Sequence, residues 1–149
     1  MRQGGKIVCG LFFFVLAGCI SLPKESEERD QIAKKFEIRP DRAKIYIYRN
    51  KFVGGLFNYP IWVNDRLVGS VSSSTYQMLS VKEGKFNFRV AYGNEPQKAI
   101  SIKGNNLYFV LVDTNIGLFS PHLSIEQQDS ENGKEAVRSR ELVKRHQTD

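Results

Sequence analysis

Few residues of this chain have the type and spacing that catalysis requires. The two histidines, His122 and His146, are far apart, and the sequence contains no H-E-x-x-H, G-x-S-x-G, C-x-x-C or P-loop pattern. Asp113 and Arg49 each end an apolar run, where a strand end can present a side chain to a cleft. For both, a strand-end cap or a solvated charge is the favoured interpretation, as an exposed position is for His122. We therefore expect no catalytic site, no metal site and no cofactor.

The thiol of Cys19 is the exception, because its surroundings indicate covalent modification. Arg2 and Lys6 form a short positive region, and residues 7–17 are apolar. This is the layout of a secretory signal peptide. The apolar run is well short of the roughly 20 residues that a bilayer-spanning helix needs.

The segment Leu16-Ala17-Gly18-Cys19 resembles a bacterial lipobox. The resemblance implies diacylglycerol transfer to the Cys19 thiol, cleavage between Gly18 and Cys19, and acylation of the new amino terminus. Two or more acyl chains anchor a protein stably, whereas a single chain does not. The alternatives are a plain signal peptide with an incidental cysteine and an uncleaved N-terminal anchor.

The residue after Cys19 bears on the destination of the protein. By analogy with lipoprotein sorting in two-membrane bacteria, Asp at this position would favour retention in the inner membrane, and this chain has Ile20. The expected location is the bacterial cell envelope, at the outer membrane facing the periplasm. The expected partner is the membrane, through the acyl chains, with an envelope protein or a glycan as a further candidate.

Composition limits the remaining functions. The chain has 22 Lys and Arg against 16 Asp and Glu, a charge of +6 that falls to +4 when Arg2 and Lys6 leave with the signal. The basic residues are scattered along the sequence, which argues against nucleic acid as a partner. Cys9 leaves with the signal and Cys19 carries lipid, so the mature domain has no disulfide and no thiol for catalysis.

The sequence divides into four parts. Residues 1–18 are the signal peptide, and residues 19–40 are charged and predict a solvated tether, with a short helix over 25–35 as the alternative. As a flexible coil, about 20 residues would span roughly 25 Å. Residues 41–128 alternate with period two, and residues 129–149 predict a helical tail that packs weakly or frays.

Residues 41–128 predict an all-β fold. Seven or eight short strands, separated by turn signals, indicate a single antiparallel β-sandwich. Asn64-Asp65 between two apolar runs predicts a tight hairpin. Phe86, Phe88, Val90 and Tyr92 share one face of the clearest strand, and the nearly continuous apolar run 107–112 predicts a central strand covered on both faces.

Several of these segments resemble an uncharacterised family of bacterial lipoproteins that carry a domain of unknown function. The resemblance covers roughly residues 41–128 and implies a compact sandwich similar to small periplasmic PEGA-like or immunoglobulin-like domains. It implies no activity. The residues that carry it, besides the lipobox, are Ile45-Tyr46-Ile47-Tyr48-Arg49, Asn58-Tyr59-Pro60-Ile61-Trp62-Val63-Asn64, the strand with Gly69, Glu83-Gly84-Lys85 and Leu107-Tyr108-Phe109-Val110.

The candidate binding surface is aromatic. Its residues are Tyr46, Tyr48, Phe57, Tyr59 and Trp62. Exposed aromatic rings would form a platform for a partner or a glycan, although a lid on the core is the favoured interpretation for segment 52–60. The expected function is therefore a lipid-anchored, non-enzymatic envelope protein that displays a small β-sandwich for binding or structure. The alternatives are a carbohydrate- or peptidoglycan-binding module and a hydrolase that pairs Asp113 with another carboxylate.

Overall fold

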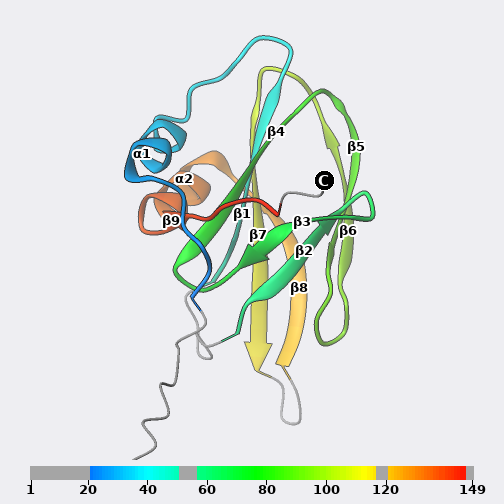
Figure 1. Cartoon of the computed structure of the whole chain (residues 1–149). Helices are drawn as coiled ribbons and strands as arrows, with labels where there is room; N and C mark the ends of the chain where they lie inside the picture. Colours follow the sequence, from blue (N-terminus) through cyan, green and yellow to red (C-terminus); the bar gives the residue numbers. More distant parts are fainter. Residues whose placement is uncertain (1–20, 51–56, 117–120, 147–149) are drawn as a thin grey trace, which may run out of the picture.

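Two β-sheets pack face to face, and two helices cover the outer face of one of them (Figure 1). The computed structural model describes residues 21–50, 57–116 and 121–146, so the signal segment and Cys19 lie outside the described residues. The elements in the described part are α1 (Glu27–Lys34), β1 (Ala43–Arg49), β2 (Tyr59–Val63), β3 (Arg66–Val71), β4 (Thr75–Val81), β5 (Gly84–Val90), β6 (Gln97–Ile102), β7 (Leu107–Ile116), β8 (Pro121–Gln128), α2 (Ser130–Arg138) and β9 (Glu141–Leu142).

The predicted β-rich, sandwich-like architecture is confirmed. The strand order is β8-β7-β1-β4-β9 in one sheet and β3-β2-β5-β6 in the other. At one edge of the sandwich β3 lies against β4, and at the opposite edge β6 lies against β8. The eight predicted strands correspond to β1–β8.

The expectation of a purely antiparallel sandwich is wrong. β1 pairs in parallel with β7, and β4 pairs in parallel with β9. Parallel neighbours need a long connection. Between β1 and β7 the chain forms β4 and the whole second sheet, so it can re-enter the first sheet in the same direction.

The main core fills the space between the two sheets. Alternate residues of β1 point into it, and Ile45 and Ile47 are at most 1 % exposed. Phe88 and Val90 of β5 face them from the other sheet, each 1 % exposed. The predicted apolar face of this strand is therefore confirmed.

A second core lies on the outer face of the five-stranded sheet, under both helices. Ala33 and Phe36, at the end of α1, are buried against Tyr46 and Phe109. The prediction of a solvated tether is wrong for this segment, and the alternative of a short helix is confirmed. The few apolar residues of this segment did not indicate burial in the sequence. Two of them, Ala33 and Phe36, nevertheless cover the aromatic outer face of the five-stranded sheet.

The C-terminal segment is also docked, which the prediction of a fraying helix over 130–145 missed. Helix α2 ends at Arg138, and Glu141 and Leu142 then form β9. Asp129 caps α2 through bonds from the backbone amides of Glu131 and Asn132. The chain beyond the helix is held by backbone pairing, which a search for helical periodicity does not detect.

Local geometry explains two of the tightest features. Asn64 and Asp65 both have positive φ, as a two-residue hairpin of the favoured type requires. Gly133 of α2 is buried where the helix crosses β7. A Cβ atom at this position would lie 2.1 Å from Phe109 Cγ, which is too close for any side chain. Only glycine allows the helix to approach the sheet this closely.

Gly133→Ala therefore provides a test of the helix docking. The added methyl group should overpack the second core and lower the free energy of unfolding by about 1–3 kcal/mol, although alanine favours helix. Urea unfolding measures the change. Gly104→Ala is the control, because a Cβ there has no neighbour closer than 3.7 Å. Equal stability of the two variants would contradict the docking of α2 on Phe109.

Candidate binding site

The expected aromatic pair on β1 is not exposed. Tyr46 and Tyr48 are 0 % and 3 % exposed, because the helices cover the face of β1 on which they lie. The Tyr46 hydroxyl donates to the Ala33 carbonyl oxygen at 2.7 Å, and burial raises the pKa of Tyr46. Period-two alternation correctly separates these tyrosines from the isoleucines. It cannot show that a distant helix covers the second face.

The other three aromatic candidates do not form one platform. Tyr59 is buried in the main core, Trp62 is half-buried, and Phe57 is 52 % exposed. The ring of Phe57 lies 6.1 Å from that of Tyr92, whereas Trp62 stacks under the guanidinium of Arg89 at 4.8 Å. The glycan-binding alternative requires two exposed coplanar rings, and the described members of this set do not supply them.

The residues considered for catalysis lie apart. Asp113 accepts hydrogen bonds from the Asn50 side-chain amide and the Thr114 backbone amide. It lies inside β7, which continues to Ile116, so the expectation that Asp113 ends a strand is wrong. His122 is exposed on β8, and His146 lies beside β3. Among the described residues, no group of three His, Cys, Asp or Glu is close enough to hold a metal ion.

Arg49, which the sequence placed at a strand end, is completely buried. Its Nη1 donates to the Phe57 carbonyl oxygen at 2.8 Å, and its guanidinium lies 4.4 Å from the centre of the Tyr59 ring. Arg140, 5 % exposed, donates to the Arg49 carbonyl oxygen at 2.7 Å and lies over Tyr48. Burial lowers the pKa of both arginines. Carbonyl groups and rings are the partners of these arginines, and Nε and Nη2 of Arg49 and Nε of Arg140 have no hydrogen-bond partner among the described residues.

A hollow of about 1060 Å³ lies at the edge where β3 meets the C-terminal segment. Basic residues dominate its charged lining: Arg29, Arg66, Lys144 and Arg145, with His146 beside them. The single acidic residue in the lining is Glu25, and its carboxylate accepts from Arg29 at 3.2 Å. Four cations therefore face one already paired carboxylate.

A smaller hollow of about 300 Å³ continues this surface around α1. It shares Glu25, Arg29 and Arg145 with the larger hollow and adds Arg39 and Lys44. We call the two together the basic groove. Lys44 projects from β1 and is 8 % exposed, and its pKa is lowered by burial first and by the nearby Arg39 second. No carboxylate in the described part of the chain lies within ion-pair distance of Lys44.

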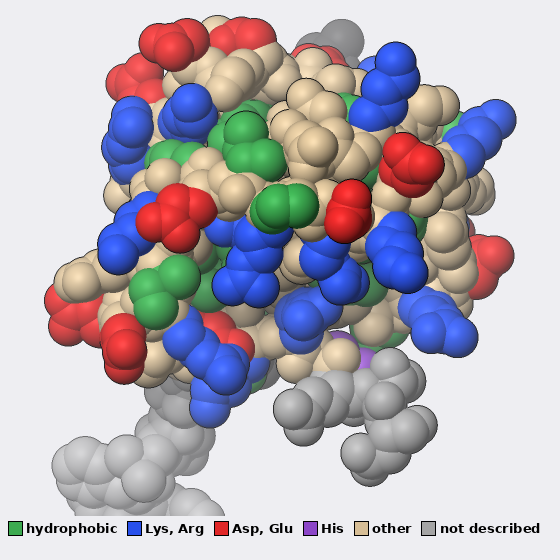
Figure 2. All heavy atoms as spheres, turned by 90° about the horizontal axis from the view of Figure 1, so that it is seen from above, with side chains coloured by type: hydrophobic (Ala, Val, Ile, Leu, Met, Phe, Trp, Pro, Cys, Tyr) green, Lys and Arg blue, Asp and Glu red, His purple; other side chains and the backbone are tan. Residues whose placement is uncertain are grey.

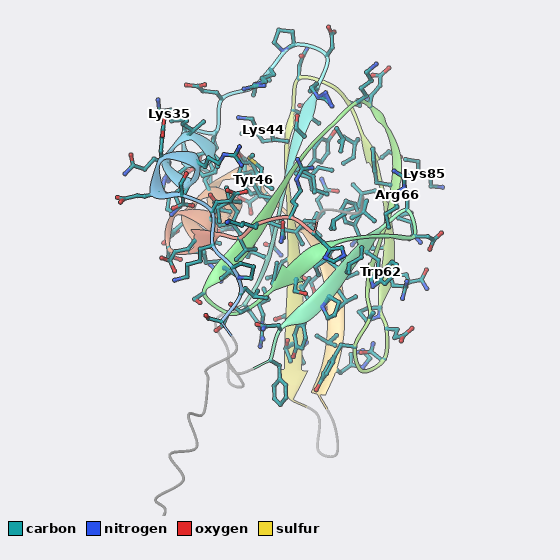
Figure 3. The ribbon with its side chains drawn as sticks, in the orientation of Figure 1. Lys35, Lys44, Tyr46, Trp62, Arg66 and Lys85 are labelled. Atoms are coloured by element: carbon teal, nitrogen blue, oxygen red, sulfur yellow. The ribbon has the colours of Figure 1, made fainter. Side chains whose placement is uncertain are left out.

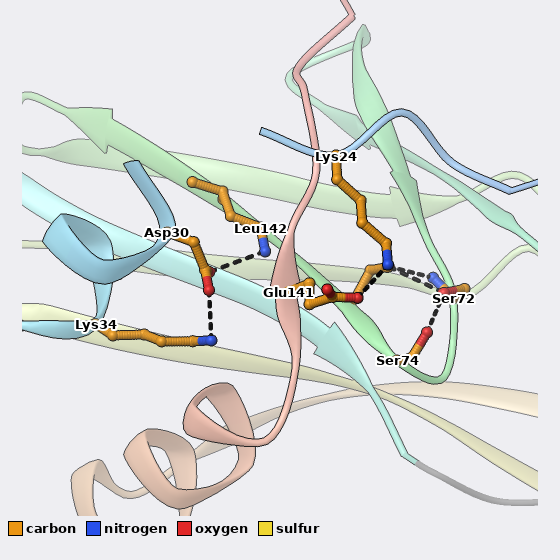
Figure 4. Close-up of polar contacts among 8 residues, drawn as sticks. Lys24, Asp30, Lys34, Ser72, Ser74, Glu141 and Leu142 are labelled. Carbon is orange, nitrogen blue, oxygen red and sulfur yellow. Dashed lines mark hydrogen bonds and ion pairs between the residues drawn. The ribbon is translucent and has the colours of Figure 1, made fainter. Parts of the chain in front are cut away.

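Backbone pairing between the two ends of the domain builds the groove. Lys144 N donates to Pro23 O at 2.9 Å, Glu25 N donates to Leu142 O at 2.9 Å, and Lys24 bridges Val143. We call this pairing of residues 23–25 with 142–144 the terminal clasp. Lys24 and Glu141 add an ion pair beside it (Figure 4).

Two side chains, the buried Gln77 and the partly buried Asp30, fix the clasp to the sheets. The Gln77 side-chain amide donates to Lys144 O at 3.2 Å, and Gly69 leaves room for that amide. The Asp30 carboxylate accepts from Leu142 N at 3.0 Å, from the Tyr76 hydroxyl at 2.7 Å and from the Lys34 ammonium (Figure 4). Asp30 thus connects α1, β4 and β9. The basic side chains of the groove are therefore carried by a fixed backbone.

The distribution of charges along the sequence does not indicate this groove. Its cations come from residue 29, residues 39 and 44, residue 66 and residues 144–145, so they form no basic run in the sequence. They converge only because the clasp brings the two ends of the domain beside β3. The basic residues are scattered along the sequence, and folding brings six of them to the groove.

Gly18 and Cys19, the predicted cleavage and lipidation residues, lie outside the described part of the chain. No helix in the described part is long and apolar enough to cross a membrane. Comparison with known proteins adds little. No protein-family model matches the sequence, and the chain is 26 % identical over 136 residues to an uncharacterized protein of Haemophilus influenzae, which covers 89 % of this chain and 80 % of that protein.

Replacement of Asp30 tests whether the clasp is a structural element. Asp30→Ala removes the acceptor of the Tyr76 hydroxyl and of Leu142 N, so we expect a loss of about 1–3 kcal/mol in the free energy of unfolding, measured in urea. Glu28→Ala is the control, because Glu28 is an exposed acid in the same helix. A loss no larger than that of the control would mean that Asp30 does not hold the clasp.

Proposed function

We propose that the protein is a lipid-anchored lipoprotein of the bacterial cell envelope, whose β-sandwich binds a partner at the membrane surface without catalysing a reaction. The outer membrane, facing the periplasm, is the proposed location. The lipobox-like Leu16–Cys19 segment supports the anchor. The basic groove supports binding, because it gathers cations around one carboxylate that is already paired with Arg29.

The observation that carries this proposal is how early the chain becomes part of the fold. Leu22 and Pro23 line the groove, and Pro23 already pairs with Lys144. Three residues, Ile20 to Leu22, lead from Cys19 to Pro23, and Leu22 already lines the groove. A fully extended chain covers at most about 3.6 Å for each of the three steps from Cys19 to Leu22. The groove rim would therefore lie within about 11 Å of the acylated residue.

The link between Cys19 and the folded domain is therefore much shorter than the tether over 19–40 expected from the sequence. A coil of about 20 residues would let the domain sample a shell roughly 25 Å deep. A link of three residues holds the domain against the leaflet and limits which faces reach the membrane. Such restriction raises the effective concentration of the groove for ligands at that surface.

The anchor is tested by Cys19→Ala in cells fed an alkyne-bearing fatty acid. The wild-type protein should take up the label and leave washed membranes only with detergent, because its acyl chains are buried in the bilayer. The variant should take up no label and should leave the membrane fraction in a high-salt wash. An unlabelled wild-type protein would refute lipid anchoring.

A further inference from the structure

We propose that the basic groove binds the phosphate-bearing headgroups of anionic lipids in the leaflet that holds the anchor. The inference deepens the proposed function and rests on it, because the acyl chains are what bring the groove to that leaflet. It assigns the domain a ligand class and an orientation: the edge formed by β3 and the terminal clasp faces the membrane.

The charge of the groove fits an anion. Figure 2 shows basic side chains, with acidic ones among them, on the face seen from above. The basic side chains that line the larger hollow are Arg29, Arg66, Lys144 and Arg145. Within the described part of the chain, only Arg29 among them has an ion-pair partner. Guanidinium groups bind phosphate through parallel hydrogen bonds, which suits Arg66 and Arg145 to this ligand.

Lys44 is a second, independent indication. Lys44, on β1, lines the smaller hollow, and Arg66, on β3, lines the larger one (Figure 3). The Lys44 residue is 8 % exposed and its ammonium forms no ion pair within the described part of the chain. Burial and Arg39 lower its pKa, and the Glu37 carboxylate opposes them from beyond ion-pair distance. An anion bound in the smaller hollow would supply a closer counter-charge.

The apolar part of the lining points to a lipid rather than to a free anion. Leu22, Pro23, Leu67 and Val68 lie in the groove beside the cations. A surface with cations next to aliphatic side chains matches the boundary between headgroups and acyl chains. Leu22 and Pro23 are also the residues nearest to Cys19, so the apolar lining lies where the membrane begins.

The backbone of the groove is fixed before any ligand arrives. Val68 O accepts from His146 N at 3.2 Å, and the clasp and Gln77 hold Lys144. Cations on such a frame are already gathered, so a headgroup need not order a loop in order to bind. A flexible basic tail would lack this preorganisation, because its cations would have to be ordered when the headgroup binds.

The test uses the complete mature chain with Cys19→Ser, exported behind a conventional signal peptide so that no lipid is attached. Co-sedimentation with vesicles of phosphatidylglycerol in phosphatidylcholine should show binding, and vesicles of phosphatidylcholine alone should not. Arg66→Gln with Arg145→Gln should weaken binding by about 30-fold, as expected for two basic residues at an anionic surface. The matched control is Lys98→Gln with Lys103→Gln, which removes the same charge from exposed positions at the β6 end of the sandwich.

Each result decides the proposal. Loss of binding in the groove variant but not in the control supports it. Equal loss in both would show attraction by net charge alone and would overturn it. A further outcome is that inorganic phosphate or polyglutamate binds in the groove as tightly as the vesicles do. That result would also overturn the proposal, because the ligand would then be a soluble anion or an acidic protein. Because no acyl chain is present, these results do not depend on whether the native protein is lipidated.

Discussion

The backbone pairing of residues 23–25 with residues 142–144 is the constraint on which the rest of the structure depends. It joins the two ends of the domain, and Asp30 and Gln77 fix it to α1 and β4 with partly buried hydrogen bonds. The partly buried carboxylate and the buried amide would cost free energy without these partners, so the pairing and the helices stabilise each other. The helices can cover the outer face of β1 because both ends of the chain are held there.

The same pairing determines the surface chemistry. It places Lys144 and Arg145 opposite Arg66, across from the segment that leads to Cys19. None of these positions forms a charge cluster in the sequence. The basic groove is therefore a product of chain topology, and its nearness to the proposed anchor follows from the small number of residues between Cys19 and Pro23. In the proposed function, the anchor and the groove act together to bind the protein to the membrane.

Period-two alternation predicted β1–β8 and the buried face of β5, because one face of each strand must meet the opposite sheet. The sequence could not reveal that Tyr46 and Tyr48 are covered as well, since the covering helices have only a few apolar residues, such as Ala33 and Val137. Parallel pairing of β1 with β7 depends on how the intervening chain crosses between sheets. The groove was missed for a similar reason: residues distant in sequence create it.

The most direct test of the account is the orientation of the native lipoprotein on a bilayer. In the proposed mature form Cys19 is the one cysteine and is acylated, so Ser70→Cys in the groove and Ser101→Cys on β6 can each carry a single bimane fluorophore. Vesicles with spin-labelled lipid headgroups quench only nearby fluorophores. The account predicts strong quenching at residue 70 and little at residue 101. Equal quenching at the two positions, or stronger quenching at residue 101, would contradict it.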